Sequence, residues 1–171
     1  MHDQTHGGFF GHDSGSRPAP KVFLRALLYS TGKVGRVIEH LYVRLRRGET
    51  RQNFNIWVYG EDRLMRGSGL FVGPEGVAAN HHFLLPADGT TLEFKGGDYR
   101  LEVFARIVGS RDAILLQSVD LTLPVTVAEQ LKTEAAGAYF DWGPDSQSYH
   151  VDVRGEATPN GVRSAGPRNQ S

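Results

Sequence analysis

Cysteine is absent from this chain of 171 residues, and other signals that narrow down function are absent with it. The lack of thiols excludes disulfide bonds, a cysteine nucleophile and thiolate metal sites. No apolar run approaches the roughly eighteen residues that a membrane-spanning helix needs. The first residues show no basic stretch followed by an apolar one, as a secretory signal would. We therefore expect a cytoplasmic protein that has no contact with a membrane.

Net charge is also lacking, since 19 basic side chains balance 19 acidic ones. The net charge of zero conceals an uneven distribution along the chain. Residues 21–72 hold ten Lys or Arg and four Asp or Glu, whereas residues 73–153 hold five Lys or Arg and twelve Asp or Glu. Such a split is typical of an anion-binding or a self-complementary surface. The simpler interpretation is that the two halves pair their charges on one surface. The sequence pI of about 7.1 argues against nucleic acid as a partner.

Residues 97–107 alternate apolar and mostly charged side chains. Tyr99, Leu101 and Val103 lie on the apolar side, which predicts a strand with one buried face. Residues 113–123 show a similar rhythm after a Gly-Ser-Arg-Asp turn, so the two segments are expected to form a long antiparallel hairpin.

Gly97-Asp98-Tyr99 at the start of this strand resembles the tyrosine corner of immunoglobulin-like and fibronectin-III-like sandwiches. The resemblance implies a two-layer antiparallel fold in which the Tyr99 hydroxyl bonds back to the main chain. The cysteine pair of antibody domains is missing. Because sandwiches of this kind host many unrelated activities, the resemblance implies no particular function.

A second hairpin is predicted around Gly48, which suits the first central position of a type II′ turn. This turn sets Arg47 opposite Thr50 and Val43 opposite Phe54, with Phe54 in the core. The same register, continued, places a group of Arg and aromatic residues together on the other face of the hairpin. This group comprises His40, Tyr42, Arg44, Arg46, Arg51, Trp57 and Tyr59.

The rest of the chain predicts an all-β protein of about eight strands, with a short helix near residues 127–136. Further strands are expected at 22–29, 63–72 with a bend, 77–85, 91–95, 139–142 and 149–153. Residues 1–20 and 155–171 contain turn signals without apolar periodicity, so we expect a disordered arm and a disordered tail. The sandwich domain then covers residues 21–154.

The Arg and aromatic group is the preferred candidate surface, because guanidinium groups beside rings hold phosphates, carboxylates, bases or sugars. The alternative is that these side chains simply cover one another. A second ring cluster is expected at the closing hairpin, where Trp142, Tyr139 and Tyr149 would suit a sugar. There the alternative is that Trp142 closes the end of the core.

Motifs for catalysis are missing. There is no Gly-x-Ser-x-Gly elbow and no phosphate-binding loop. His150 and Asp152 share a strand face with Asp141 nearby, and a metal-dependent enzyme would need a further histidine there. We expect neither a cofactor nor a metal.

The leading hypothesis is a non-catalytic interaction module that binds a protein partner or itself through an exposed sheet face or edge. The alternative is a module that binds an anion or a carbohydrate.

Overall fold

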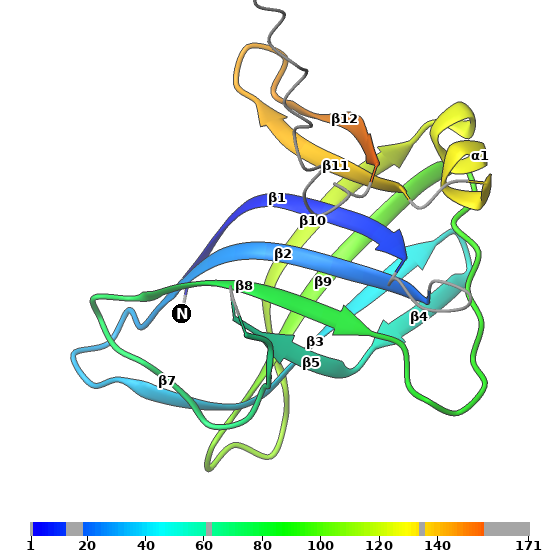
Figure 1. Cartoon of the computed structure of the whole chain (residues 1–171). Coiled ribbons are helices and arrows are strands. Elements are labelled where there is room, and N and C mark those ends of the chain that lie inside the picture. Colours follow the sequence, from blue (N-terminus) through cyan, green and yellow to red (C-terminus); the bar gives the residue numbers. More distant parts are fainter. Residues whose placement is uncertain (1, 13–18, 61–62, 134–135, 156–171) are drawn as a thin grey trace, which may run out of the picture.

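The computed structural model describes residues 2–12, 19–60, 63–133 and 136–155 (Figure 1). The larger of its two antiparallel sheets has seven strands in the order β12, β11, β1, β2, β8, β5, β6. These strands are β1 (His2–His12), β2 (Pro20–Tyr29), β5 (Ile56–Tyr59), β6 (Met65–Arg66), β8 (Val77–Leu84), β11 (Ala136–Gly143) and β12 (Ser148–Gly155).

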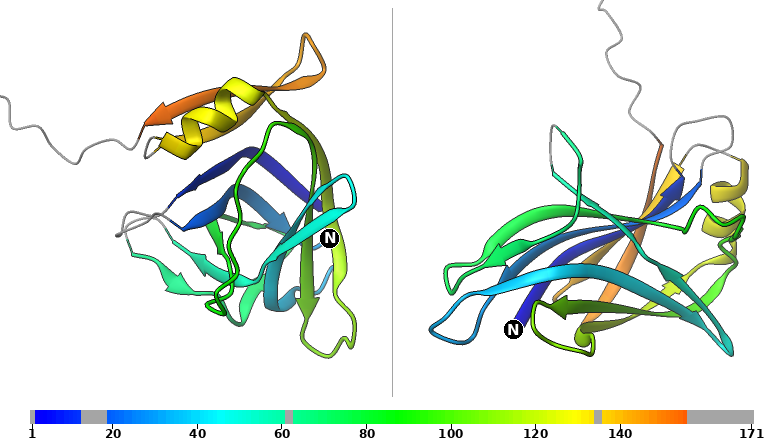
Figure 2. Two further views of the ribbon diagram at one scale, coloured as in Figure 1. Left: turned by 90° about the vertical axis from the view of Figure 1, so that its right-hand side faces the viewer. Right: turned by 90° about the horizontal axis from the view of Figure 1, so that it is seen from below.

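The smaller sheet has five strands, with β10, β9, β3 and β4 in this order and β7 paired to the start of β3. These strands are β3 (Arg36–Arg47), β4 (Thr50–Phe54), β7 (Leu70–Val72), β9 (Gly97–Ile107) and β10 (Ile114–Leu123). The helix α1 (Val125–Thr133) follows β10 and contacts β11 at one end of the molecule (Figure 2). In the part of the chain that is described, no helix has the length and apolar character needed to span a bilayer.

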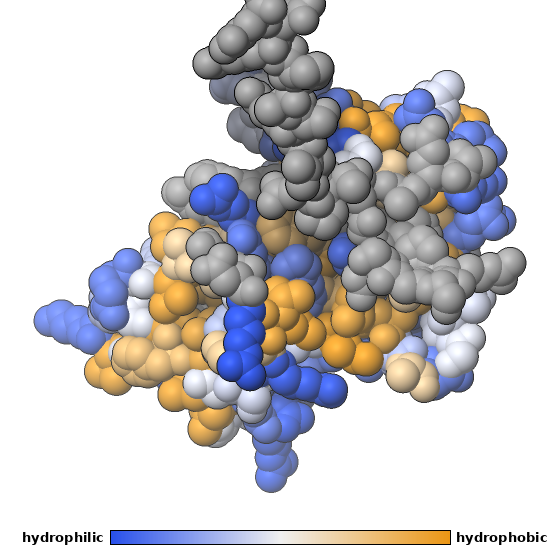
Figure 3. Space-filling model, viewed as in Figure 1, coloured by the Kyte–Doolittle hydropathy of each residue, from blue (hydrophilic) through white to orange (hydrophobic). Residues whose placement is uncertain are grey.

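The two sheets pack face to face, which confirms the predicted all-β antiparallel sandwich. Its finer assignment as immunoglobulin-like stays a prediction. The core lies between the layers and contains side chains from both sheets and from α1. Apolar side chains also gather on the side of the molecule that Figure 3 shows, over strands of the seven-stranded sheet. Leu27 on β2, for example, is 37% exposed.

The alternation predicted for residues 97–107 is confirmed in β9. Tyr99, Leu101 and Val103 are buried, with exposed fractions of 6%, 2% and 3%. The Tyr99 hydroxyl donates a hydrogen bond to the Lys95 carbonyl oxygen at 2.6 Å and accepts one from the Lys95 amide at 3.0 Å. These are the main-chain bonds that the tyrosine-corner resemblance implies.

The hairpin at Gly48 keeps its predicted register over the whole of β4. Arg47 lies opposite Thr50 and Val43 opposite Phe54, which is fully buried. Gly48 has a φ of 54°, and among non-glycine residues of the described chain only Gln147 has a positive φ, so Glu49 does not. A positive φ at the first central position alone fits the type II′ turn.

The predicted register fails beyond Phe54. The chain leaves the five-stranded sheet at Asn55, and β5 pairs with β8 in the other sheet. Trp57 is therefore 1% exposed in the core and does not lie opposite His40 on an outer face. The crossing buries a large ring area, which stabilises the fold more than a longer two-stranded hairpin would.

Several boundaries also differ from prediction. The helix begins at Val125, where the Ala128 amide bonds to the Pro124 carbonyl oxygen, and it ends at Thr133. Residues 91–95 form no strand. Within the segment predicted to be a disordered arm, His2–His12 form β1 between β2 and β11. Strand pairing uses backbone groups, so it needs no apolar periodicity. Of the predicted tail, residues 156–171 lie outside the described residues.

Candidate functional site

Most of the predicted Arg and aromatic group lies on the outer face of the five-stranded sheet. Tyr42, Arg44 and Arg46 alternate along β3 with the core residues of that strand. Arg51 joins them from β4, directly opposite Arg46. His40 lies on the same strand, with its ring 6.3 Å from the Tyr42 ring. The structure thus places five of the seven predicted residues on this face, and the buried Trp57 meets the His40 ring edge to face, with centroids 6.4 Å apart.

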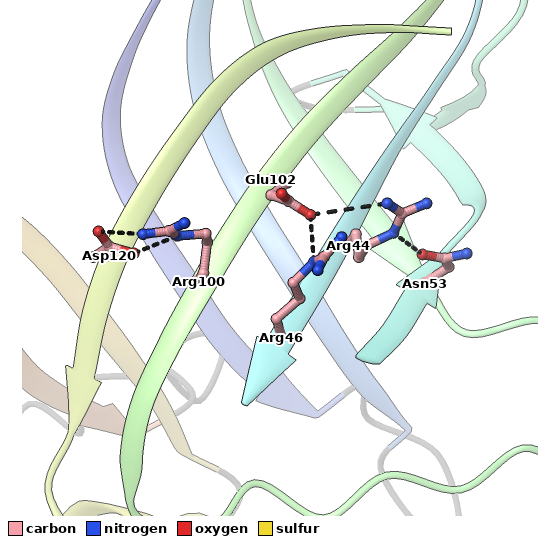
Figure 4. Close-up of polar contacts among 6 residues, drawn as sticks. All are labelled: Arg44, Arg46, Asn53, Arg100, Glu102 and Asp120. Carbon is pink, nitrogen blue, oxygen red and sulfur yellow. Dashed lines mark hydrogen bonds and ion pairs between the residues drawn. The ribbon is translucent and has the colours of Figure 1, made fainter. Parts of the chain in front are cut away.

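Two of the arginines on this face are engaged by one carboxylate (Figure 4). Arg46 Nε donates to Glu102 Oε2 at 3.0 Å, and Arg44 Nη1 lies 3.9 Å from the same oxygen. Arg44 Nε also donates to Asn53 Oδ1 at 3.0 Å. Surface pairs of this kind contribute little to stability, but they neutralise the charge that an incoming anion would need.

Two further bidentate pairs flank this cluster. Arg100 holds Asp120 at 2.7 and 3.1 Å, and Arg106 holds Glu39 at 2.9 and 2.6 Å. The hydrogen bond from each arginine lowers the pKa of its carboxyl partner. Glu39 lies in the basic half of the sequence and Arg106 in the acidic half. The contacts of Arg44 and Arg46 with Glu102 pair the basic half with the acidic half as predicted, whereas Arg100 and Asp120 both belong to residues 73–153.

The rings on the outer face also cover one another. Tyr42 stacks on Phe104 of β9 with ring centroids 5.0 Å apart and planes 7° apart. The Arg44 guanidinium lies 4.8 Å above the Phe104 centroid. Phe104 was not among the predicted surface residues, although its position in the alternating pattern of residues 97–107 would have shown it to face outward.

Trp57 and Tyr59 are the two predicted aromatic residues that do not lie on the outer face of the five-stranded sheet. Together with Phe83, they surround the buried ring of His81. Trp57 Nε1 donates to His81 Nδ1 at 3.1 Å, and His81 is 2% exposed. Because Nδ1 accepts, the neutral ring carries its proton on Nε2, which has no partner among the described residues. Burial, and to a smaller extent the neighbouring His82, lowers the pKa of His81 to about 4.

A depression of about 690 Å³ lies beside His40, and we call it the His40 depression. Arg66, Arg106 and Arg111 contribute to its lining, against the acidic Glu39 and Asp112. Burial lowers the pKa of His40, and the nearby positive charges of Arg106 and Arg66 lower it further, although a backbone bond with Asn55 opposes them. The balance of these effects favours the neutral form of the ring. The sequence did not indicate that Arg66 and Arg111 lie near His40, because loops and the crossing of β5 between the sheets bring them to this depression.

A second depression, of about 560 Å³, lies between β10 and the β11–β12 hairpin. We call it the Trp142 slot. Trp142 is 53% exposed, so the alternative that it closes the core is wrong. Its ring meets the edge of Tyr149 on the facing strand, 5.2 Å between centroids. Tyr139 does not line the slot. The Arg154 guanidinium lies 4.6 Å from its ring centroid.

The carboxylates of the closing hairpin pair with an arginine. Asp141 lies opposite His150, as the predicted hairpin requires. Both Asp141 and Asp152 contact Arg154, at 3.5 and 3.2 Å, and His150 Nε2 lies 2.7 Å from Ser146 Oγ. Over the described ranges, no group of three or more His, Asp or Glu is placed to hold a metal ion.

Comparisons with protein-family models, with curated proteins and with solved structures find no match to this chain.

Proposed function

We propose that this protein is a non-catalytic interaction module that binds a second copy of itself, or an extended segment of a protein partner, at the free edge of β10. The observation that carries the proposal is the position of β10 at the end of its sheet. In the described part of the chain no strand pairs with its outer side. β10 is ten residues long, and the β11–β12 hairpin lies beside its residues 117–122, so the open part of the edge is the Ile114–Leu116 end. Backbone donors and acceptors that point away from the sheet there are a template for strand addition.

The sequence of β10 supports this role, because edge strands that must stay unpaired usually carry charges, prolines or a very short length. β10 contains a single charged residue, Asp120, which Arg100 neutralises. Its pairing with β9 shifts register between Leu115 and Gln117, and this irregularity is the one protective feature of the strand. Of the other end strands, β6 has two residues and β4 has five with Arg51 among them, while β12 carries Asp152 and Arg154.

Apolar side chains extend this edge. Ile114 and Leu115 are 41% and 52% exposed, and Leu115 lies opposite Phe104, which stacks on Tyr42. An apolar strip therefore runs from β3 across β9 to the edge. A second copy is the occupant that can be tested directly, because antiparallel edge strands related by a two-fold axis complement each other. Since backbone hydrogen bonds and apolar contacts would join the two edges, association is expected to be insensitive to salt.

A double substitution, Ile114→Lys with Leu115→Lys, is expected to weaken self-association by at least about tenfold, because each lysine must be desolvated at the paired edge. Sedimentation velocity over a range of concentrations measures the effect. Gln52→Lys on the opposite edge strand, β4, is the matched control and should keep the wild-type constant. Equal constants for the double variant and wild type would contradict strand addition at β10.

A second candidate function, anion binding, is favoured by one observation: Arg66 and Arg111 at the His40 depression form no ion pair among the described residues. Replacing both by Ala is expected to lower retention on a heparin column at low salt, since each contributes a charge to the contact. Arg44→Ala with Arg51→Ala serves as the control and should change retention less. Unchanged retention of the Arg66 and Arg111 variant would contradict this candidate.

A further inference from the structure

The two tryptophans of this chain have opposite environments. Trp57 is 1% exposed in the core, whereas Trp142 is 53% exposed at the end of β11. An exposed indole leaves apolar surface in water, and its flat face suits another flat, partly apolar surface. The ring is also braced, since Tyr149 lies directly opposite on β12 and meets it edge to face. Trp142 is therefore a supported platform that the sandwich does not use for packing.

The polar lining of the Trp142 slot contains amides, hydroxyls and one carboxylate. The side chains that matter here are Gln117, Asp120, Thr122, Gln147 and Ser148. No Lys or Arg lines the slot. Phosphates and nucleic-acid backbones need positive charge, so this lining does not suit them. An uncharged ligand with one apolar face and many hydroxyl groups fits both the ring and the amides.

The polar groups are held in place before any ligand arrives. Asp120 is fixed by the two bonds from Arg100, and Thr122 Oγ1 donates to Asp98 Oδ1 at 2.7 Å. On the other wall Ser148 Oγ donates to Ser146 Oγ at 2.9 Å. Fixed donors and acceptors reduce the entropy lost on binding.

The hairpin turn adds a second, independent observation. Gln147 has a φ of 49° and is the one non-glycine residue of the described chain in the left-handed region. Glycine, asparagine or aspartate usually occupies such a position, because a longer side chain strains the backbone there. Strained residues concentrate at binding sites, where the side chain is required. The strain at Gln147 puts a long amide on the wall of the slot beside Trp142.

From these observations we infer that the Trp142 slot is a binding site for a neutral oligosaccharide. A sugar ring stacks on the Trp142 indole, and its hydroxyl groups exchange hydrogen bonds with Gln117, Gln147 and the Asp120 carboxylate. This site is separate from strand addition, which depends on the Ile114 and Leu115 end of β10.

The experiment is a titration of the full chain with uncharged hexasaccharides of glucose, xylose, mannose and N-acetylglucosamine, followed by tryptophan fluorescence and calorimetry. At least one sugar is expected to give a saturable change that is unaffected by salt. Trp142→Ala should weaken its binding by at least about tenfold, and Trp142→Phe by less. Asn53→Ala on the outer face of the other sheet is the control and should bind as wild type does.

Gln147→Gly separates a binding role from a structural one. Glycine relieves the strain at this φ, so the variant should melt no lower than wild type while binding the sugar more weakly. The inference is overturned if no sugar of the panel gives a saturable response at millimolar concentration. It is equally overturned if binding survives in Trp142→Ala or disappears at high salt. Measuring the association state of the Trp142 variant, which should equal that of wild type, keeps this test distinct from that of the β10 edge.

Discussion

Lowering the pH from 7 to 4 is expected to reduce the free energy of unfolding by about 3 kcal/mol through one imidazole, His81. Burial lowers the pKa of the folded state to about 4, whereas the unfolded chain titrates near 6.5. Between these two values the unfolded state binds a proton that the folded state does not. The stabilisation is therefore complete above about pH 6.5, falls as the pH falls toward 4, and changes no further below that value.

Urea unfolding at a series of pH values measures this dependence. His81→Asn removes the titration but keeps an oxygen that can accept the Trp57 indole hydrogen, so its stability should change less between pH 6.5 and 4. His40, whose pKa is also lowered by burial, leaves a slope of the same sign in this variant. His150→Asn, on the exposed hairpin, is the control. Equal slopes for wild type and His81→Asn would show that His81 is not buried as the structure has it.

Replacing Phe54 by Ala is expected to cost about 3 to 5 kcal/mol of unfolding free energy. The ring is fully buried and lies opposite Val43, at the last residue before the chain crosses between the sheets. Packed strands on both layers limit how far the cavity can collapse, and the residual void adds to the lost transfer energy.

Asn53→Ala is the neighbouring control for Phe54. Its side chain is exposed and loses only the bond to Arg44, so a cost of less than about 1 kcal/mol is expected. Chemical denaturation of both variants provides the comparison. A small cost for Phe54→Ala, close to that of Asn53→Ala, would contradict the burial of this residue and the predicted hairpin register with it.

Local patterns predicted a large part of the fold. The period of two in residues 97–107 identified the buried Tyr99, Leu101 and Val103, because neighbouring positions of a strand face opposite sides. The turn at Gly48 set the register of β3 and β4, because a two-residue loop leaves few ways to pair the strands beside it. Both features depend on residues that are close in sequence.

The candidate sites depended more on contacts between distant residues. Glu102 lies more than fifty positions beyond Arg44 and Arg46, and no local pattern shows that it neutralises them. Likewise, Trp142 and Tyr149 were visible as a ring pair of one hairpin, but Gln117 reaches their slot only because β10 lies under that hairpin. Side chains of different segments come together according to strand order, which alternation does not encode.

The sequence by itself determined the class of fold and the buried faces of β3, β4 and β9, since alternation and turn chemistry act over a few residues. Only the tertiary structure decided that the chain changes sheets at Asn55, that His81 is buried against Trp57, and that β10 ends its sheet. These outcomes depend on how much apolar area each arrangement removes from water, and that area is a property of the whole packed molecule.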